Sequence, residues 1–130
     1  MPEASSVRVL IVDDQKSARM LARDSLRVLG LVQVRECADG REAMEDIANY
    51  PPHLIISDMS MPNMSGLDLL QAVRGNAEAS KTAFIMLTGH GEQEMVKKAI
   101  QLGVNNYIRK PFTAADLKRK IEAVLGPLTR

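Results

Sequence analysis

Five side chains that can take part in chemistry each end or directly follow a short strand-like run: Asp13, Asp14, Asp58, Thr88 and Lys110. If these runs are neighbouring parallel strands, their carboxyl ends meet at one edge of a sheet, where such sheets bind ligands. Three carboxylates brought together repel one another, so they require either protonation or a bound cation. Oxygen ligands favour Mg²⁺ or Ca²⁺ over zinc, and the sequence contains no His or Cys cluster that would indicate a transition metal.

The lysine and the threonine complete a set of groups suited to phosphoryl chemistry. A magnesium ion with few protein ligands usually keeps waters and accepts oxygens from phosphate. Lys110 adds a positive charge, Thr88 adds a hydroxyl, and an aspartate could act as the nucleophile that forms an aspartyl phosphate. Taken singly, each aspartate could instead cap a helix, Thr88 could be a turn residue and Lys110 could be solvated. His53, after a proline, is expected to be structural, whereas His90 stands at the strand edge and could contact the site.

The elements that would position these groups alternate along the chain. Strand-like runs cover residues 7–12, 32–37, 53–58, 82–87 and 105–110. Helical periodicity covers residues 15–29, 39–49, 66–74, 91–102 and 113–125. In the first helix, the apolar stripe is expected to contain Ala18, Leu21, Ala22, Ser25, Val28 and Leu29. Strict alternation predicts an α/β fold, in which helices cover both faces of one parallel sheet.

The length of the chain selects among such folds. Five strand–helix units in 130 residues fit a flavodoxin-like doubly wound sheet with strand order 2-1-3-4-5, and they are too few for an eight-fold barrel. In that order the first and third strands are neighbours, and the ligand crevice lies at their carboxyl ends. Asp13, Asp14 and Asp58 are therefore expected to meet there.

The composition narrows the class of protein. A hydrophobic fraction of 45% and a charged fraction of 25% are ordinary for one globular domain. Cys37 is the only cysteine, no apolar run reaches the roughly 18 residues of a membrane span, and the polar start MPEASS does not resemble a signal peptide. These features predict a cytoplasmic protein. Aromatic residues make up 3% without tryptophan, which argues against a nucleic-acid binder that stacks bases.

Charge is spread unevenly along the chain. Residues 97–130 carry eight Lys/Arg and two Asp/Glu, whereas residues 1–96 carry nine Lys/Arg and 14 Asp/Glu. The basic end could steer an acidic partner, or it could be a solvated helix face.

Four stretches of the sequence carry a known pattern in a fixed order: VLIVDDQ, SDMSMPNMSGLDLL, MLTGHGE and NNYIRKPF. Together they resemble the receiver domain of bacterial response regulators, in particular the single-domain, CheY-like chemotaxis type. The resemblance covers residues 7 to 125, which is nearly the whole chain. We therefore expect a flexible segment at residues 1–6, a receiver domain at residues 7–126, a tail at residues 127–130 and no output domain.

The resemblance implies a role for each acidic residue. Asp58 matches the phospho-accepting aspartate, and Asp13 and Asp14 match the pair that holds Mg²⁺, for which Mn²⁺ could substitute. Asp58 itself and the backbone carbonyl of Ser60 would be further ligands of the metal. The side chains of Ser60 and His90 occupy positions that vary within the family and are thought to tune dephosphorylation.

The resemblance also implies a switch. Thr88 matches the hydroxyl that moves to the phosphoryl group, Lys110 the lysine that contacts phosphoryl oxygens, and Tyr107 the aromatic switch residue. The Lys110–Pro111 peptide bond is expected to be cis, as it is in this family.

These assignments predict a phosphorelay response regulator. A sensor histidine kinase would phosphorylate Asp58, and the face formed by residues 91–102, 105–110 and 113–125 would bind a partner protein in chemotaxis or motility, such as the flagellar motor switch. The protein is expected to be a monomer that binds neither nucleic acid nor membrane, and to be no enzyme beyond assisting its own phosphoryl transfer and dephosphorylation.

Several alternatives stay open. The protein could be a phosphate sink, or a stand-alone regulator of another kinase pathway. A flavodoxin-like redox protein would need flavin-stacking aromatics and a phosphate-binding loop where this chain has Asp13 and Asp14. A phosphatase with an aspartyl nucleophile after the first strand would need a cap domain or substrate pocket, for which the chain has little room.

Overall fold

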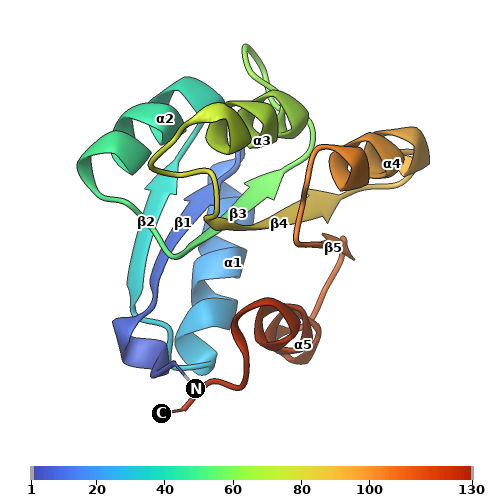
Figure 1. Ribbon diagram of the computed structural model, residues 1–130. Helices are drawn as coiled ribbons and strands as arrows, with labels where there is room; N and C mark the ends of the chain where they lie inside the picture. Colours follow the sequence, from blue (N-terminus) through green and yellow to red (C-terminus); the bar gives the residue numbers. More distant parts are fainter. Residues whose placement is uncertain (1, 130) are drawn as a thin grey trace.

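The computed structural model describes residues 2–129, which form a five-stranded parallel sheet with helices on both faces (Figure 1). The strands are β1 (Arg8–Val12), β2 (Gln33–Cys37), β3 (Leu54–Asp58), β4 (Ala83–Thr88) and β5 (Asn106–Arg109). The helices are α1 (Lys16–Val28), α2 (Gly40–Asn49), α3 (Gly66–Gly75), α4 (Gln93–Gln101) and α5 (Ala114–Leu125), preceded by a 3₁₀ turn, η1 (Ala4–Ser6). The strand order is β2-β1-β3-β4-β5, which confirms the predicted doubly wound topology.

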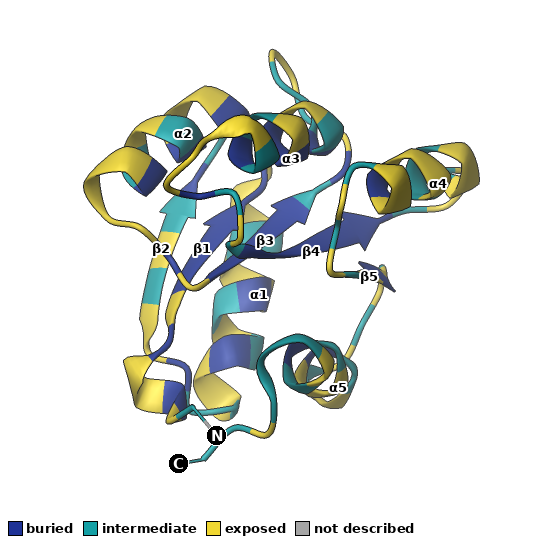
Figure 2. Ribbon diagram, viewed as in Figure 1, coloured by how far each residue is buried: buried dark blue, intermediate teal, exposed yellow. Residues whose placement is uncertain are grey.

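Two hydrophobic cores flank the sheet, because successive side chains of a strand point to opposite faces. Ile11 and Ile85 pack with α1 and α5 in one core, whereas Leu10 and Phe84 pack with α2, α3 and α4 in the other. Figure 2 shows the central strands β1, β3 and β4 largely buried between helices whose outer faces are exposed, whereas the edge strand β2 is partly exposed. Burial on both faces explains why the central strands appear in the sequence as continuous apolar runs.

The apolar stripe of α1 differs from the expected one. Ala22 and Leu26 are buried against the sheet, but Leu21 is 69% and Val28 is 63% exposed. The helix is rotated so that its inward face is centred on Ala22 and Leu26. Leu21 instead lines a cavity that is shared with Phe112. The periodicity of residues 15–29 therefore predicted the helix correctly, but it was wrong in placing Leu21 and Val28 on the buried face.

The two ends of the described chain lie together (Figure 1). The Ala4 N–H donates to the Thr129 carbonyl at 2.7 Å, and the Thr129 N–H donates to the Pro2 carbonyl at 2.9 Å. Ala4 is fully buried in the core beneath α1 and α5. Residues 4–6, which lie in the segment expected to be flexible, thus form a turn that packs on the domain. Met1 and Arg130 lie outside the described residues.

Within residues 2–129, none of the helices has the length and hydropathy that a membrane-spanning helix needs.

Candidate functional site

Three aspartates meet at the carboxyl ends of β1 and β3, as the strand order requires. One carboxylate oxygen from each of Asp13, Asp14 and Asp58 lies within 4.8 Å of the other two. Asp13 is buried, Asp58 is half-buried and Asp14 is exposed. The predicted convergence of these carboxylates is therefore present, and their oxygens are of the hard type that binds Mg²⁺.

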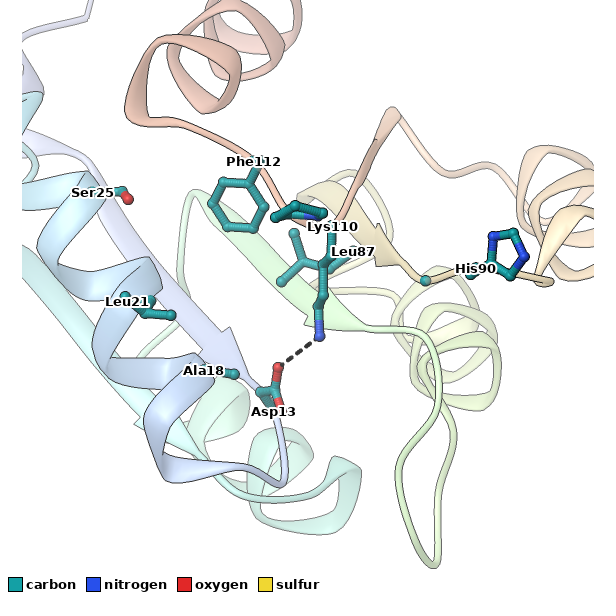
Figure 3. Close-up of a pocket in the computed structure, with 10 residues that line it drawn as sticks. Asp13, Ala18, Leu21, Ser25, Leu87, His90, Lys110 and Phe112 are labelled. Carbon is teal, nitrogen blue, oxygen red and sulfur yellow. Dashed lines mark hydrogen bonds and ion pairs between the residues drawn. The ribbon is translucent and has the colours of Figure 1, made fainter.

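Lys110 brings a positive charge into this acidic group. Its amine lies 2.9 Å from Asp58 Oδ1 and 3.4 Å from Asp13 Oδ2. Figure 3 shows the Lys110 side chain extending from the end of β5 toward Asp13. The peptide bond between Lys110 and Pro111 is cis, as expected.

The charges of these groups depend on one another. Burial raises the pKa of Asp58 above its ordinary value, although the hydrogen bond and charge of Lys110 oppose the effect, and the charges of Asp13 and Glu92 add to it. Burial acts to lower the pKa of Lys110, but the hydrogen bonds and charges of Asp58 and Asp13 outweigh it, so this pKa is raised. Lys110 therefore stays protonated at neutral pH and compensates part of the negative charge.

The position of Asp13 is fixed by its neighbours in the sequence and by α1. Its carboxylate accepts the Gln15 N–H at 2.9 Å, and its backbone carbonyl accepts a hydrogen bond from Arg19 at 2.7 Å. Arg19 in turn pairs with Glu36 of β2 at 3.3 Å. Arg19 was not identified as a site residue from the sequence, because helical periodicity only placed it on the polar face of the helix.

Thr88 and Tyr107 lie on neighbouring strands β4 and β5. Thr88 is buried, and its hydroxyl donates to the Ile108 carbonyl at 3.4 Å. Tyr107 is 39% exposed, and the Lys120 amine lies 5.5 Å from the centre of its ring. In this structure the threonine hydroxyl thus faces β5, and the tyrosine ring lies on the outer surface.

Ser60 and His90 lie in the loops that follow β3 and β4. The Ser60 hydroxyl donates to Glu92 Oε2 at 2.6 Å. His90 is exposed, and its Nδ1 lies 3.1 Å from a guanidinium nitrogen of Arg109. Figure 3 shows the His90 ring well away from the amine of Lys110. Glu92 was not identified from the sequence; the available signal was an acidic residue at the start of a helix that follows a candidate site loop.

A cavity of about 520 Å³ opens beside Asp13 and Lys110. Apart from these two residues its lining is mainly apolar and includes Leu21 of α1 and Phe112 (Figure 3). The half-buried Asp58 carboxylate therefore lies next to Lys110 and two further carboxylates, and the cavity opens beside Asp13 and Lys110. This arrangement can hold a divalent cation and present Asp58 as a nucleophile.

Comparisons with known proteins agree with this geometry. Residues 9–122 match the family model described as response regulator receiver domain. The chain is 47% identical over 128 residues to a Rhizobium etli protein named "Probable chemotaxis protein CheY", covering 98% of this chain and 99% of that protein. It is 41% identical over 121 residues to "Chemotaxis protein CheY1" of Helicobacter pylori, covering 92% and 98%. The solved structure of chemotaxis response regulator CheY4 of Vibrio cholerae superposes with a TM-score of 0.83 at 33% identity, covering 92% and 98%.

Proposed function

This chain belongs to the response regulator receiver domain family, and we propose that it accepts a phosphoryl group from a histidine kinase on Asp58. The observation that carries the proposal is the contact of the half-buried Asp58 carboxylate with Lys110 at 2.9 Å, beside two further carboxylates. The receiver domain that we propose spans residues 7–126, which enclose the segment matched by the family model.

The transfer needs one nucleophile and one leaving group. A carboxylate oxygen of Asp58 forms a bond to phosphorus while the phosphorus–nitrogen bond of the donor phosphohistidine breaks, and the electron pair returns to the imidazole nitrogen. Lys110 already contacts Asp58, so its amine can also contact the oxygens of the transferred group. Because transfer of a phosphoryl group depends mainly on positioning and charge stabilisation, these contacts account for most of what the protein must supply.

Mg²⁺ is the cofactor that the donor set fits best, with Mn²⁺ as a substitute. We propose that Asp13, Asp14, Asp58 and the backbone carbonyl of Ser60 hold it. The carboxylate oxygens lie close enough together to share one ion, and they are hard ligands. When bound, the ion neutralises charge on the transferring oxygens.

Phosphorylation would be read by a partner protein at the surface formed by α4, β5 and α5. Tyr107 and Ile100 expose apolar surface there, and Lys97, Lys98 and Lys118 are exposed and basic. The relatives are named chemotaxis proteins, which supports a partner in chemotaxis, such as a motor component. A phosphate sink would use Asp58 in the same way but would not need this surface. The monomeric state and the cytoplasmic location stay predictions.

The test is phosphorylation in solution. Wild type incubated with Mg²⁺ and acetyl phosphate, or with a phosphorylated kinase, should gain one phosphoryl group by intact-protein mass spectrometry. Asp58→Asn should gain none, whereas Asp24→Asn, which removes an exposed carboxylate of α1, should behave as wild type. Labelling of the Asp58→Asn variant would refute the assignment. Rapid multiple turnover of a phosphomonoester would favour the phosphatase alternative.

A further inference from the structure

One carboxylate joins the two loops that border the site. Glu92 precedes the first residue of α4, and its Oε2 accepts the Ser60 hydroxyl at 2.6 Å. Its Oε1 accepts the backbone N–H of Gly89 in a very short hydrogen bond. Ser60 lies two residues after Asp58, and Gly89 directly follows Thr88. Glu92 therefore connects the segment after the phosphorylation site with the segment after the switch threonine.

The two segments leave the sheet side by side. β3 pairs with β4 up to Asp58 and Leu87, and the Met59 N–H donates to the Leu87 carbonyl at 3.0 Å. The donors that Glu92 occupies are therefore at the same edge of the sheet as Asp58. Among the described residues, Glu92 is also the acid outside the three-carboxylate group whose charge acts on Asp58.

A phosphoryl group on Asp58 changes both the charge and the number of hydrogen-bond acceptors at this edge of the sheet. It adds about −1.5 to −2 units of charge and three strong acceptor oxygens, which require hydrogen-bond donors. The Ser60 hydroxyl and the Gly89 N–H are donors in the adjoining segments, and both are already paired with a carboxylate. A carboxylate and a phosphoryl group also repel each other, so Glu92 and the modified Asp58 favour different arrangements of the two loops.

We propose that Glu92 restrains phosphoryl acceptance: its carboxylate holds Ser60 and Gly89 in the unphosphorylated state and must release them when Asp58 is modified. The inference rests on the proposed function of Asp58. A group shifts an equilibrium only by interacting differently with the two states, and Glu92 interacts with the unphosphorylated state more favourably. Loss of Glu92 should therefore favour the phosphorylated arrangement.

The experiment compares matched variants. Glu92→Ala removes both contacts, whereas Glu94→Ala removes a carboxylate two residues away that is 88% exposed and pairs with Lys97. The probe is beryllofluoride with Mg²⁺, a noncovalent mimic of the phosphoryl group, titrated while the amide signal of Gly89 is followed by NMR. We expect Glu92→Ala to bind the probe roughly tenfold more tightly than wild type, since a hydrogen bond to a charged group contributes on the order of one factor of ten. Glu94→Ala should match wild type.

Three further measurements separate a contact from a general charge effect. Ser60→Ala removes one of the two hydrogen bonds and keeps the charge of Glu92, so it should shift affinity in the same direction by a smaller factor. The effect of Glu92→Ala should persist at high salt, where interactions between separated exposed charges are screened. The wild-type Gly89 amide should move on probe binding toward its position in the free Glu92→Ala variant.

The outcomes distinguish the two proposals. If neither acetyl phosphate nor a phosphorylated kinase labels wild-type Asp58, the proposed function fails. If wild type is labelled but Glu92→Ala binds the probe no more tightly than Glu94→Ala, or more weakly than wild type, then only the role of Glu92 is overturned. An affinity gain that vanishes at high salt would likewise overturn it.

Discussion

The amine of Lys110 lies 2.9 Å from the carboxylate of Asp58, although the two residues end strands that are not neighbours in the sheet. Lys110 follows β5 and reaches past the end of β4 to the end of β3. The pair links the proposed phosphorylation site to the end of β5, a strand of the proposed partner surface. A change of charge at Asp58 therefore directly changes the electrostatic interaction of Lys110, the residue that follows β5.

Asp58→Asn should abolish phosphoryl acceptance and raise the melting temperature of the unphosphorylated protein. An amide is isosteric with the carboxylate but is not a nucleophile. Burial raises the pKa of Asp58, so the folded state binds its proton more tightly than the unfolded state does. The resulting stabilisation is present below the ordinary pKa and is lost as pH rises through the folded value, so ionised Asp58 costs stability at neutral pH. Thermal melts at pH 7 check this, and a lower melting temperature than that of Asp24→Asn would contradict it.

Mg²⁺ should stabilise the folded domain, and the shift should depend on the acidic pair. An ion that binds only the folded state adds about 2.7 kcal/mol at a hundredfold excess over its Kd. Asp14→Ala should weaken the response, and the double Asp13→Ala, Asp14→Ala variant should lose it, because both residues belong to the three-carboxylate group. Melting curves at increasing Mg²⁺ measure the shift. An equal response in wild type and in the double variant would place the ion elsewhere.

The fold and the central site could be predicted because both follow from strand order. Strand-like runs, of which those of β1, β3 and β4 are apolar and buried on both faces, located each strand to within about one residue. Parallel topology then brought Asp13, Asp58 and Lys110 to one edge. The contact of Arg19 with the Asp13 carbonyl and the two contacts of Glu92 could not be predicted. They depend on side-chain conformations and loop paths, which the spacing of residue types does not determine.

His53 should make stability fall as the solution becomes acidic. Its Nδ1 accepts the Arg8 N–H at 2.9 Å, and a protonated ring cannot accept this bond. Burial, and then the charge of Arg8, lower the pKa of His53 below its ordinary value. The stability that this bond contributes is therefore complete above the ordinary pKa of about 6.5. It is lost as pH falls through the lower pKa of the folded state. His53→Asn keeps an acceptor oxygen without titrating, so its stability relative to wild type should rise between about pH 7 and pH 5. A parallel decline in both proteins would contradict the assignment.

Arg74 should be important for the stability of the face that carries α3 and α4. Its half-buried guanidinium donates to the carbonyls of Ser80, Thr82 and Gly103 and to the side chain of Asn105. Burial lowers the pKa of Arg74, and the surrounding carbonyl oxygens compensate for its lost hydration. Arg74→Met should cost about 1–3 kcal/mol of unfolding free energy, because the half-buried carbonyls of Ser80 and Thr82 lose their donor. Urea unfolding measures it, with the exposed Arg41→Met as the control; equal effects would refute a specific role.

Charge and apolar contact on the α4–β5–α5 surface should contribute differently to partner binding. Exposed charges at the rim of an interface mainly set the association rate and its salt dependence. Lys118→Glu should therefore slow association with an acidic partner and weaken its salt dependence, while phosphorylation of Asp58 is unchanged. Tyr107 is the proposed switch residue and lies beside the Lys120 amine, so Tyr107→Ala should instead reduce the gain in affinity on phosphorylation, a coupling of about 1–3 kcal/mol. Binding kinetics with candidate motor proteins, with and without beryllofluoride, separate the two effects.

Lys81→Glu reverses a charge that precedes β4 at the opposite edge of the sheet and serves as the control. If the Lys118→Glu and Lys81→Glu variants associate at the same rate, the basic residues form a solvated face and do not steer the partner.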